Sequence, residues 1–165
     1  MDDEIKSREA INNVILKQSD EHSIILKYIS GVEGLLRDKK YHAFIAKVTY
    51  FAESMKQDLA EHFRREEEIF FPALLLAKPD PEIVQTVLML QKQHGILEQT
   101  IQTVSKHAHT PVKERPDEQN QIIQLYKQFI LEMKDHAGIE VKILFPAIHA
   151  SEDAMHLVRK LSDNS

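Results

Sequence analysis

The stretch HFRREEEIFFPA at residues 62–73 decides how this sequence is read, because a second version of it, HAGIEVKILFPA, stands 74 residues later at 136–147. His, Glu, Ile, Phe, Pro and Ala occupy matching places in both stretches. A shorter match, with an offset of 72, sets His22 on His94. The two halves of the chain therefore look like copies of one two-helix unit.

Apolar residues recur at intervals of three and four along nearly the whole chain, which is the period of a helix with one buried face. Polar breaks and prolines separate the helices, and the helix that carries the first stretch is expected to stop or kink at Pro72. No segment alternates with a period of two, so no sheet is expected. The predicted helices cover about residues 5–37, 44–72, 81–110 and 116–146, with a short tail helix over 151–161.

These segments predict an all-α, up-down-up-down four-helix bundle with a short C-terminal helix, because short connections between long helices favour antiparallel neighbours. The chain has 165 residues, and 42% of them are hydrophobic. This length suits a single domain over residues 1–165, with the bundle over about residues 5–148.

Composition excludes several classes of function. The chain has no Cys, which rules out disulfides, thiolate metal sites and cysteine nucleophiles. Its formal net charge of -5 argues against a nucleic-acid or anionic-membrane partner. Neither a signal peptide nor a membrane span is recognisable. We therefore expect a cytoplasmic protein that holds any metal through His, Asp or Glu.

Each repeated stretch carries a His followed four residues later by a Glu, namely His62 with Glu66 and His136 with Glu140. Residues at this spacing lie one turn apart on the same helix face. At a rise of about 1.5 Å per residue, the His of the four helices lie roughly 23–35 Å from the turns that join the helices. The sequence therefore predicts one layer of four His and two Glu inside the bundle.

A structural explanation of these residues competes with a metal site. A single His on an apolar helix face is more often hydrogen-bonded packing than a metal ligand. Six such groups without a cation would face desolvation costs of several kcal/mol per charge, so a metal ion is the better explanation of the set. A zinc or manganese site stays possible, because mixed imidazole and carboxylate ligands suit several divalent ions.

Together these motifs resemble the hemerythrin-like (HHE cation-binding) family of non-haem di-iron four-helix bundles. The resemblance rests on His22, His94 and the two stretches that run to Pro72 and Pro146, and it covers almost the whole chain. It implies a centre of two iron ions joined by an oxo or hydroxo bridge. It also implies that the two Glu of the stretches bridge the ions and that the four His complete the ligand set.

Position 98 departs from the pattern of the oxygen-carrying hemerythrins, which have two His four residues apart on the third helix. Here His94 is followed at that spacing by Glu98, and the matching position in the first helix is Leu26. Glu98 is either a further ligand, or a neighbour of one, or a residue that faces solvent; we favour a role at the metal because Glu98 continues the stripe of His94. The predicted metal ligands are His22, His62, Glu66, His94, Glu98, His136 and Glu140.

Other polar residues are candidates for orienting the imidazoles through hydrogen bonds. Asp58 and Glu132 lie one turn before the His of each His-Glu pair, and each could accept a proton from the ring nitrogen that does not bind metal. A solvated acidic face is the alternative. Gln18 and Gln93 are further candidates for this role, and Glu67 is expected to face water.

The leading functional interpretation is a binding protein, not an enzyme, that binds or senses O2, NO or another small oxidant at two iron ions. One alternative is iron handling, including donation of iron for iron–sulfur cluster repair, although repair proteins of this type typically carry a Cys-containing segment that these residues lack. Another is a di-iron oxidoreductase acting on peroxide or NO. Ferritin-type Glu-x-x-His motifs are not found at the matching positions, which disfavours iron storage.

Overall fold

A computed structural model describes residues 2–108 and 116–164, and throughout these ranges the chain forms helices and no strand. Two short segments, η1 and η2, have the wider π-helical turn. The elements are α1 (Asp2–Arg37), α2 (Tyr41–Arg65), η1 (Glu66–Phe70), α3 (Phe71–Ala77), α4 (Pro81–Ala108), α5 (Pro116–Ile139), η2 (Glu140–Leu144), α6 (Phe145–His149) and α7 (Glu152–Ser162).

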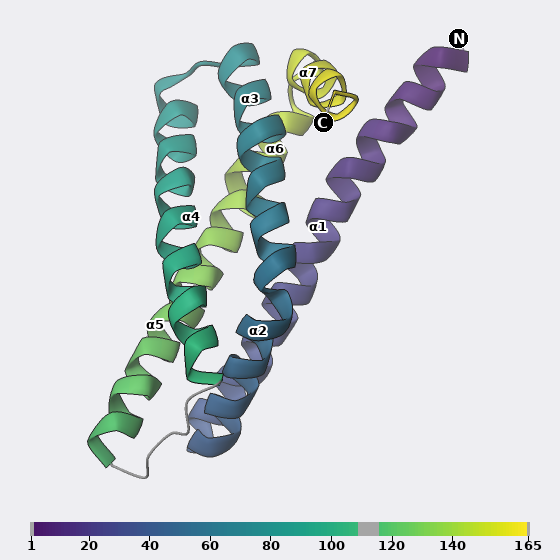
Figure 1. The fold of residues 1–165 in the computed structure, drawn as a ribbon. Helices are drawn as coiled ribbons and strands as arrows, with labels where there is room; N and C mark the ends of the chain where they lie inside the picture. Colours follow the sequence, from purple (N-terminus) through teal and green to yellow (C-terminus); the bar gives the residue numbers. More distant parts are fainter. Residues whose placement is uncertain (1, 109–115, 165) are drawn as a thin grey trace.

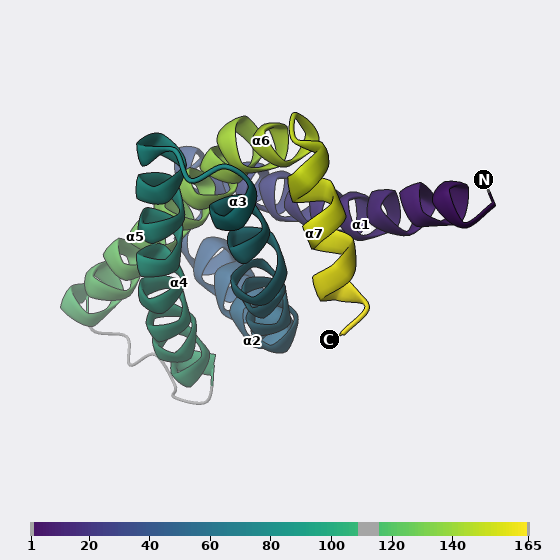
Figure 2. The same ribbon diagram turned by 90° about the horizontal axis from the view of Figure 1, so that it is seen from above.

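The long helices run alternately down and up, which confirms the predicted four-helix bundle (Figure 1). Helix α1 packs against α2 and α5, and α4 packs against the same two helices, so the four occupy the corners of the bundle. Helix α7 crosses one end, where it packs against α3 and α6 (Figure 2). The N-terminal end of α1 diverges from the other helices in both views.

The helix does not stop at Pro72, as one form of the prediction had it, but continues through η1 and α3 to Ala77. Proline lacks an N–H and clashes with the carbonyl four residues before it inside an α-helix. The π turn resolves the conflict: the N–H of Phe71 donates to the carbonyl of Glu66, five residues back, and Pro72 falls in the first turn of α3, where a missing donor is tolerated. The second repeat has the same turn at η2, before Pro146.

Two apolar clusters fill the bundle on either side of a polar layer. One cluster contains Phe44, Phe51 and Phe129 from the half of the bundle nearer the α1–α2 turn. The other contains Phe70 and Leu90 and extends under α7. On α4, His94 lies between Leu90 of the second cluster and Leu97 of the first, and along α5 and η2 His136 and Glu140 lie between Met133 of the first cluster and Leu144 of the second, so these elements contribute polar groups at a similar depth.

The tail helix closes the second cluster. The hydroxyl of Ser151 accepts a hydrogen bond from the N–H of Ala154 at 3.1 Å, as expected of a residue that caps a helix N-terminus. Ala154 and Val158 are buried against the cluster. Within the described residues, no helix is both long and apolar enough to cross a membrane.

Candidate metal centre

Six of the seven predicted ligands meet in the polar layer, and their side chains are almost completely buried. They form two groups of four, and in each group the possible ligand atoms lie within 4.8 Å of one another. The two groups share both carboxylates. The first group is His22, His62, Glu66 and Glu140, and the second is Glu66, His94, His136 and Glu140.

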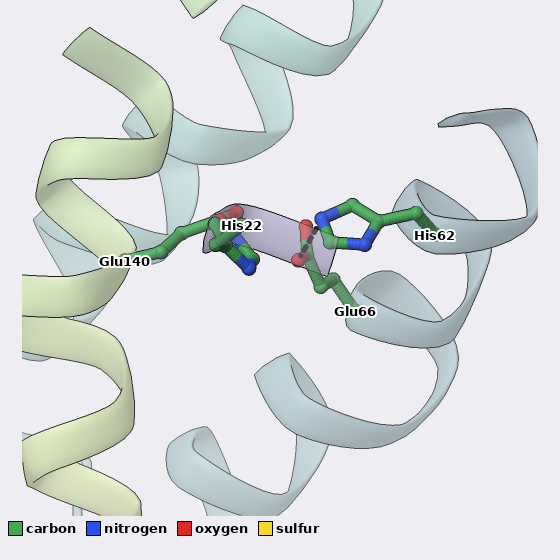
Figure 3. Close-up of side chains that lie close together, drawn as sticks. All are labelled: His22, His62, Glu66 and Glu140. Atoms are coloured by element: carbon green, nitrogen blue, oxygen red, sulfur yellow. Dashed lines mark hydrogen bonds and ion pairs between the residues drawn. The ribbon is translucent and has the colours of Figure 1, made fainter. Parts of the chain in front are cut away.

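The first group brings together four separate elements (Figure 3). His22 projects from α1 and His62 from α2, while Glu66 and Glu140 are the first residues of η1 and η2. The Nε2 atom of His62 lies 2.8 Å from Oε1 of Glu66, and Nε2 of His22 contacts Oε2 of Glu140. Each π turn thus begins at the residue whose carboxylate enters the site, in keeping with the tendency of π turns to occur at functional sites.

The second group contains four buried atoms without a hydrogen-bond partner among the described residues, namely Nε2 of His94 and His136, Oε2 of Glu66 and Oε1 of Glu140. His94 Nε2 lies 3.0 Å from the Glu66 atom, and His136 Nε2 lies 2.7 Å from the Glu140 atom, yet neither pair has hydrogen-bond geometry. Buried polar atoms are rarely left in this way. A cation among them would satisfy all four.

The spacing of the ligand atoms also fits a cation. Nitrogen and oxygen ligands bind divalent ions such as zinc at about 2.0–2.2 Å, so two atoms on opposite sides of one ion lie about 4.4 Å apart. Ligand atoms within 4.8 Å of one another therefore need only small shifts to share an ion.

The family of the chain follows from a comparison with models of known families. Residues 13–148 match the hemerythrin HHE cation binding domain. The chain belongs to this hemerythrin family. The match includes all six clustered residues. Neither the comparison with curated proteins nor that with solved structures gives a match.

In this hemerythrin domain each imidazole is oriented through Nδ1, which leaves Nε2 directed at the other ligands. His62 Nδ1 contacts Oε2 of Glu21 at 2.7 Å, and His136 Nδ1 contacts Oε1 of Gln93 at 3.0 Å. The other two contacts are His94 Nδ1 to Glu67 Oε1 at 2.8 Å and His22 Nδ1 to the Gln18 carbonyl at 2.6 Å. An acceptor at Nδ1 fixes the tautomer in which Nε2 is free for a metal ion.

Gln93 and Gln18, the latter through its main-chain carbonyl, were candidates for this role in the sequence, whereas the expected contacts of Asp58 and Glu132 are not present among the described residues. Asp58 is exposed, and Glu132 accepts a hydrogen bond from Gln128, so the His-orienting contacts come from elsewhere. Glu67 is exposed, as expected, with its side chain 44% accessible, but its Oε1 atom also contacts Nδ1 of His94. The repeat held a signal for two of the partners: the offset of 72 aligns Glu21 with Gln93, and each directly precedes a ligand His. Each therefore reaches the His of the following long helix.

Glu98 lies outside both groups of the hemerythrin domain. Its side chain is exposed and lines a surface hollow together with Phe63. The buried stripe of α4 runs from His94 through Leu97 and Ile101, at spacings of three and seven. Position 98 lies on the other side of His94 from Leu97 and Ile101, so Glu98 falls at the edge of the buried stripe, where it is exposed.

Charge in the layer is unevenly distributed between the two His-Glu pairs. Burial lowers the pKa of His62, but the charges of Glu66 and Glu21 outweigh burial and raise the pKa to about 9. For Glu66, burial is likewise outweighed, here by His62 and by hydrogen bonds, and the pKa lies well below its ordinary value. Burial and the neighbouring charge of Glu66 raise the pKa of Glu140 well above its ordinary value.

His136 and His22 resist protonation. Burial lowers the pKa of His136 to about 3, and burial together with the charge of His62 lowers the pKa of His22. These imidazoles are therefore neutral at pH 7, which is the form that binds a metal ion. A metal ion would have to displace a proton from His62, and the raised pKa of Glu140 favours a proton on that carboxyl group as well.

Proposed function

We propose that this hemerythrin domain holds two iron ions and binds a small molecule such as O2 or NO there, as a sensor or a buffer. The observation that carries the proposal is the pair of four-residue ligand groups that share Glu66 and Glu140. Each group contributes two imidazoles of its own, and both carboxylates belong to both groups. This arrangement suits two ions, each with two imidazole ligands, that the two carboxylates would bridge.

The donor set supports iron. Each ion would be held by two imidazole nitrogens and two carboxylate oxygens, a mixed set that suits iron, zinc or manganese. Membership of the hemerythrin family favours iron among these metals. Iron bound here would supply redox chemistry and coordination positions that the protein ligands leave open.

The surrounding residues restrict the site to small molecules. The ring of Phe63 stacks on His94 with centroids 4.2 Å apart, and the ring of Phe71 stacks on the same imidazole at 5.6 Å. Phe145 packs edge-on against His22 at 5.2 Å. These rings cover the imidazoles with apolar surface, and they exclude water and bulky substrates.

The burial of all six ligands favours a resident cofactor over a donated metal ion. None of the six side chains is more than 3% exposed. Release of an ion would require six buried side chains to give up their contacts with it. We therefore favour ligand binding over iron donation as the role of the centre.

The proposal is tested by reconstituting the protein with ferrous iron without oxygen and counting the iron per chain. Glu66→Ala removes one shared carboxylate and should lower the iron content below two. Glu68→Ala is the matched control, because Glu68 lies two residues away, is exposed and pairs with Arg64 at 2.9 Å. One ion or none in the parent, or no loss in Glu66→Ala, would refute the two-iron assignment.

The second part of the proposal is that a small molecule binds at the ions. It is tested by recording the optical spectrum before and after oxygen or NO is admitted. A reversible spectral change would support binding or sensing. Continuous consumption of peroxide or NO would instead indicate an oxidoreductase, and rapid transfer of iron to a chelator would indicate iron donation.

A further inference from the structure

The two halves of the polar layer differ at one buried position. The offset of 72 that sets His22 on His94 also sets Gln18 on Leu90. Both side chains are completely buried, but Leu90 belongs to an apolar cluster whereas Gln18 joins the polar layer. Only the half that contains His22 and His62 therefore places an amide beside its ligands.

The amide nitrogen of Gln18 contacts two proposed ligands of the same ion. Gln18 Nε2 donates to Oε1 of Glu66 at 2.5 Å and lies 3.2 Å from Nε2 of His62. Both atoms belong to the group that includes His22. An ion bound by His62 Nε2 would take the one lone pair of that nitrogen, whereas Oε1 of Glu66 has a second lone pair with which it can keep its hydrogen bond from the amide.

Two charged residues fix the direction of the amide. The Nε of Arg65 donates to Oε1 of Gln18 at 3.2 Å, and Nη2 of Arg65 donates to both oxygens of Glu21 at 2.8 and 2.6 Å. Because a guanidinium has donors and no acceptor, the oxygen of the amide must face Arg65. The NH2 group must then face the polar layer.

A cavity of about 340 Å³ between α1 and α2 borders this side of the layer. Its walls include the apolar side chains of Ile25 and Leu59, and its lining reaches His62, Glu21 and Arg65. The hollow between α2 and α4, of about 220 Å³, is lined by Phe63 and by none of the six ligands. Of these two hollows, the one between α1 and α2 therefore borders the layer, at His62.

We infer that Gln18 donates its amide N–H to a small ligand with a lone pair, bound at the ion that His22 and His62 hold. The inference rests on the proposed function. Once His62 binds the ion through Nε2, the amide N–H on the side of that nitrogen needs another acceptor, because an unpaired buried donor is costly. An electron-rich ligand of a few atoms, neutral or anionic, would provide that acceptor.

Azide is a suitable probe, because it is a small anion with a lone pair and its binding to the ferric protein can be followed by absorption. Iron content and helical content of each variant are measured first. Gln18→Leu introduces the residue that the other half of the layer has at the matching position, Leu90. Gln18→Met removes the amide with less change in the shape of the side chain. Gln124→Leu, on an exposed position of α5, is the control.

Both Gln18 variants should keep two iron ions and bind azide at least about tenfold more weakly than the parent, as expected for a lost hydrogen bond to an anion. The infrared stretching frequency of bound azide should shift in both and stay constant in Gln124→Leu. Unchanged azide affinity with two irons present would overturn the inference. Loss of iron from both variants would overturn it as well, because Gln18 would then support the binding of the metal and not that of the small ligand. A parent without two irons would instead refute the proposed function.

The role of Arg65 is tested by a double substitution. Arg65→Met should weaken azide binding in the parent, because the amide is no longer held, and should have no further effect in Gln18→Leu. An equal loss in both backgrounds would show that Arg65 acts by its own charge, and it would overturn the assignment of Arg65 as the residue that positions Gln18.

Discussion

The carboxylate of Glu21 lies 2.7 Å from Nδ1 of His62 and also receives two hydrogen bonds from Arg65. Burial raises the pKa of Glu21, but His62 and Arg65 together outweigh burial and lower it. Glu21 is therefore ionised, and an ionised acceptor at Nδ1 makes the imidazole a stronger electron donor at Nε2. The corresponding residue in the other half, Gln93, is a neutral acceptor.

We expect Glu21→Ala to weaken metal binding about 10- to 100-fold, because His62 loses the group that orients it. Glu21→Gln should have a smaller effect, since it reproduces the contact that Gln93 makes with His136. Competition with a chelator of known affinity measures both variants. Asp20→Ala, at the exposed neighbouring position, is the control, and an equal loss in this control would argue against a specific role for Glu21.

Glu98→Ala and Glu98→His should both match the parent in iron content, spectrum and reaction with oxygen. Glu98 is exposed on α4 and lies outside the two ligand groups, and exposed helix positions usually tolerate substitution within about 0.5 kcal/mol. Elemental analysis and stopped-flow absorption test this. A changed spectrum in Glu98→Ala would mean that Glu98 binds metal, as the sequence pattern first indicated.

Acid should release the metal. In the metal-free protein at pH 7, His62, with its pKa of about 9, is protonated, and the raised pKa of Glu140 also favours its protonated form. A metal ion must displace these protons, so affinity should fall as the pH falls, by up to about tenfold per pH unit for each proton displaced. A chelator competition at several pH values measures the slope.

Thermal unfolding of the metal-loaded and metal-free protein gives an independent check of this pH dependence. Metal that binds only the folded state raises the melting temperature, and this increment should disappear together with the metal as the pH drops. The same acid-unfolding curve for both forms would count against a structural contribution of the ions.

Phe63→Ala should lower the free energy of unfolding by about 3–5 kcal/mol, the usual cost of removing a buried aromatic side chain. The ring is 2% exposed and contacts three imidazoles of the layer. The substitution should also open the hollow beside Glu98 toward His94, and thus speed the reaction with oxygen. Urea unfolding and oxygen kinetics test the two effects separately, and Phe63→Leu, which leaves less empty space, should show smaller changes in both.

The sequence alone determined the bundle, the layer and six of its members. Helical periodicity depends on local spacing, and two His-Glu pairs repeated at a fixed offset must fall at similar depths when their helices pack side by side. The expected tail helix is also set locally, because Ser151 caps its N-terminus with a hydrogen bond from the N–H of Ala154.

Only the tertiary structure decided which residues support the ligands. The contacts of Glu21 with His62 and of Glu67 with His94 join different helices, and no spacing within one helix predicts them. The same holds for Glu98: a spacing of four keeps two residues on one helix face, but the direction of that face toward the interior is set by packing against the other helices. Side-chain partners across a bundle depend on the rotation of each helix about its axis, which local sequence does not specify.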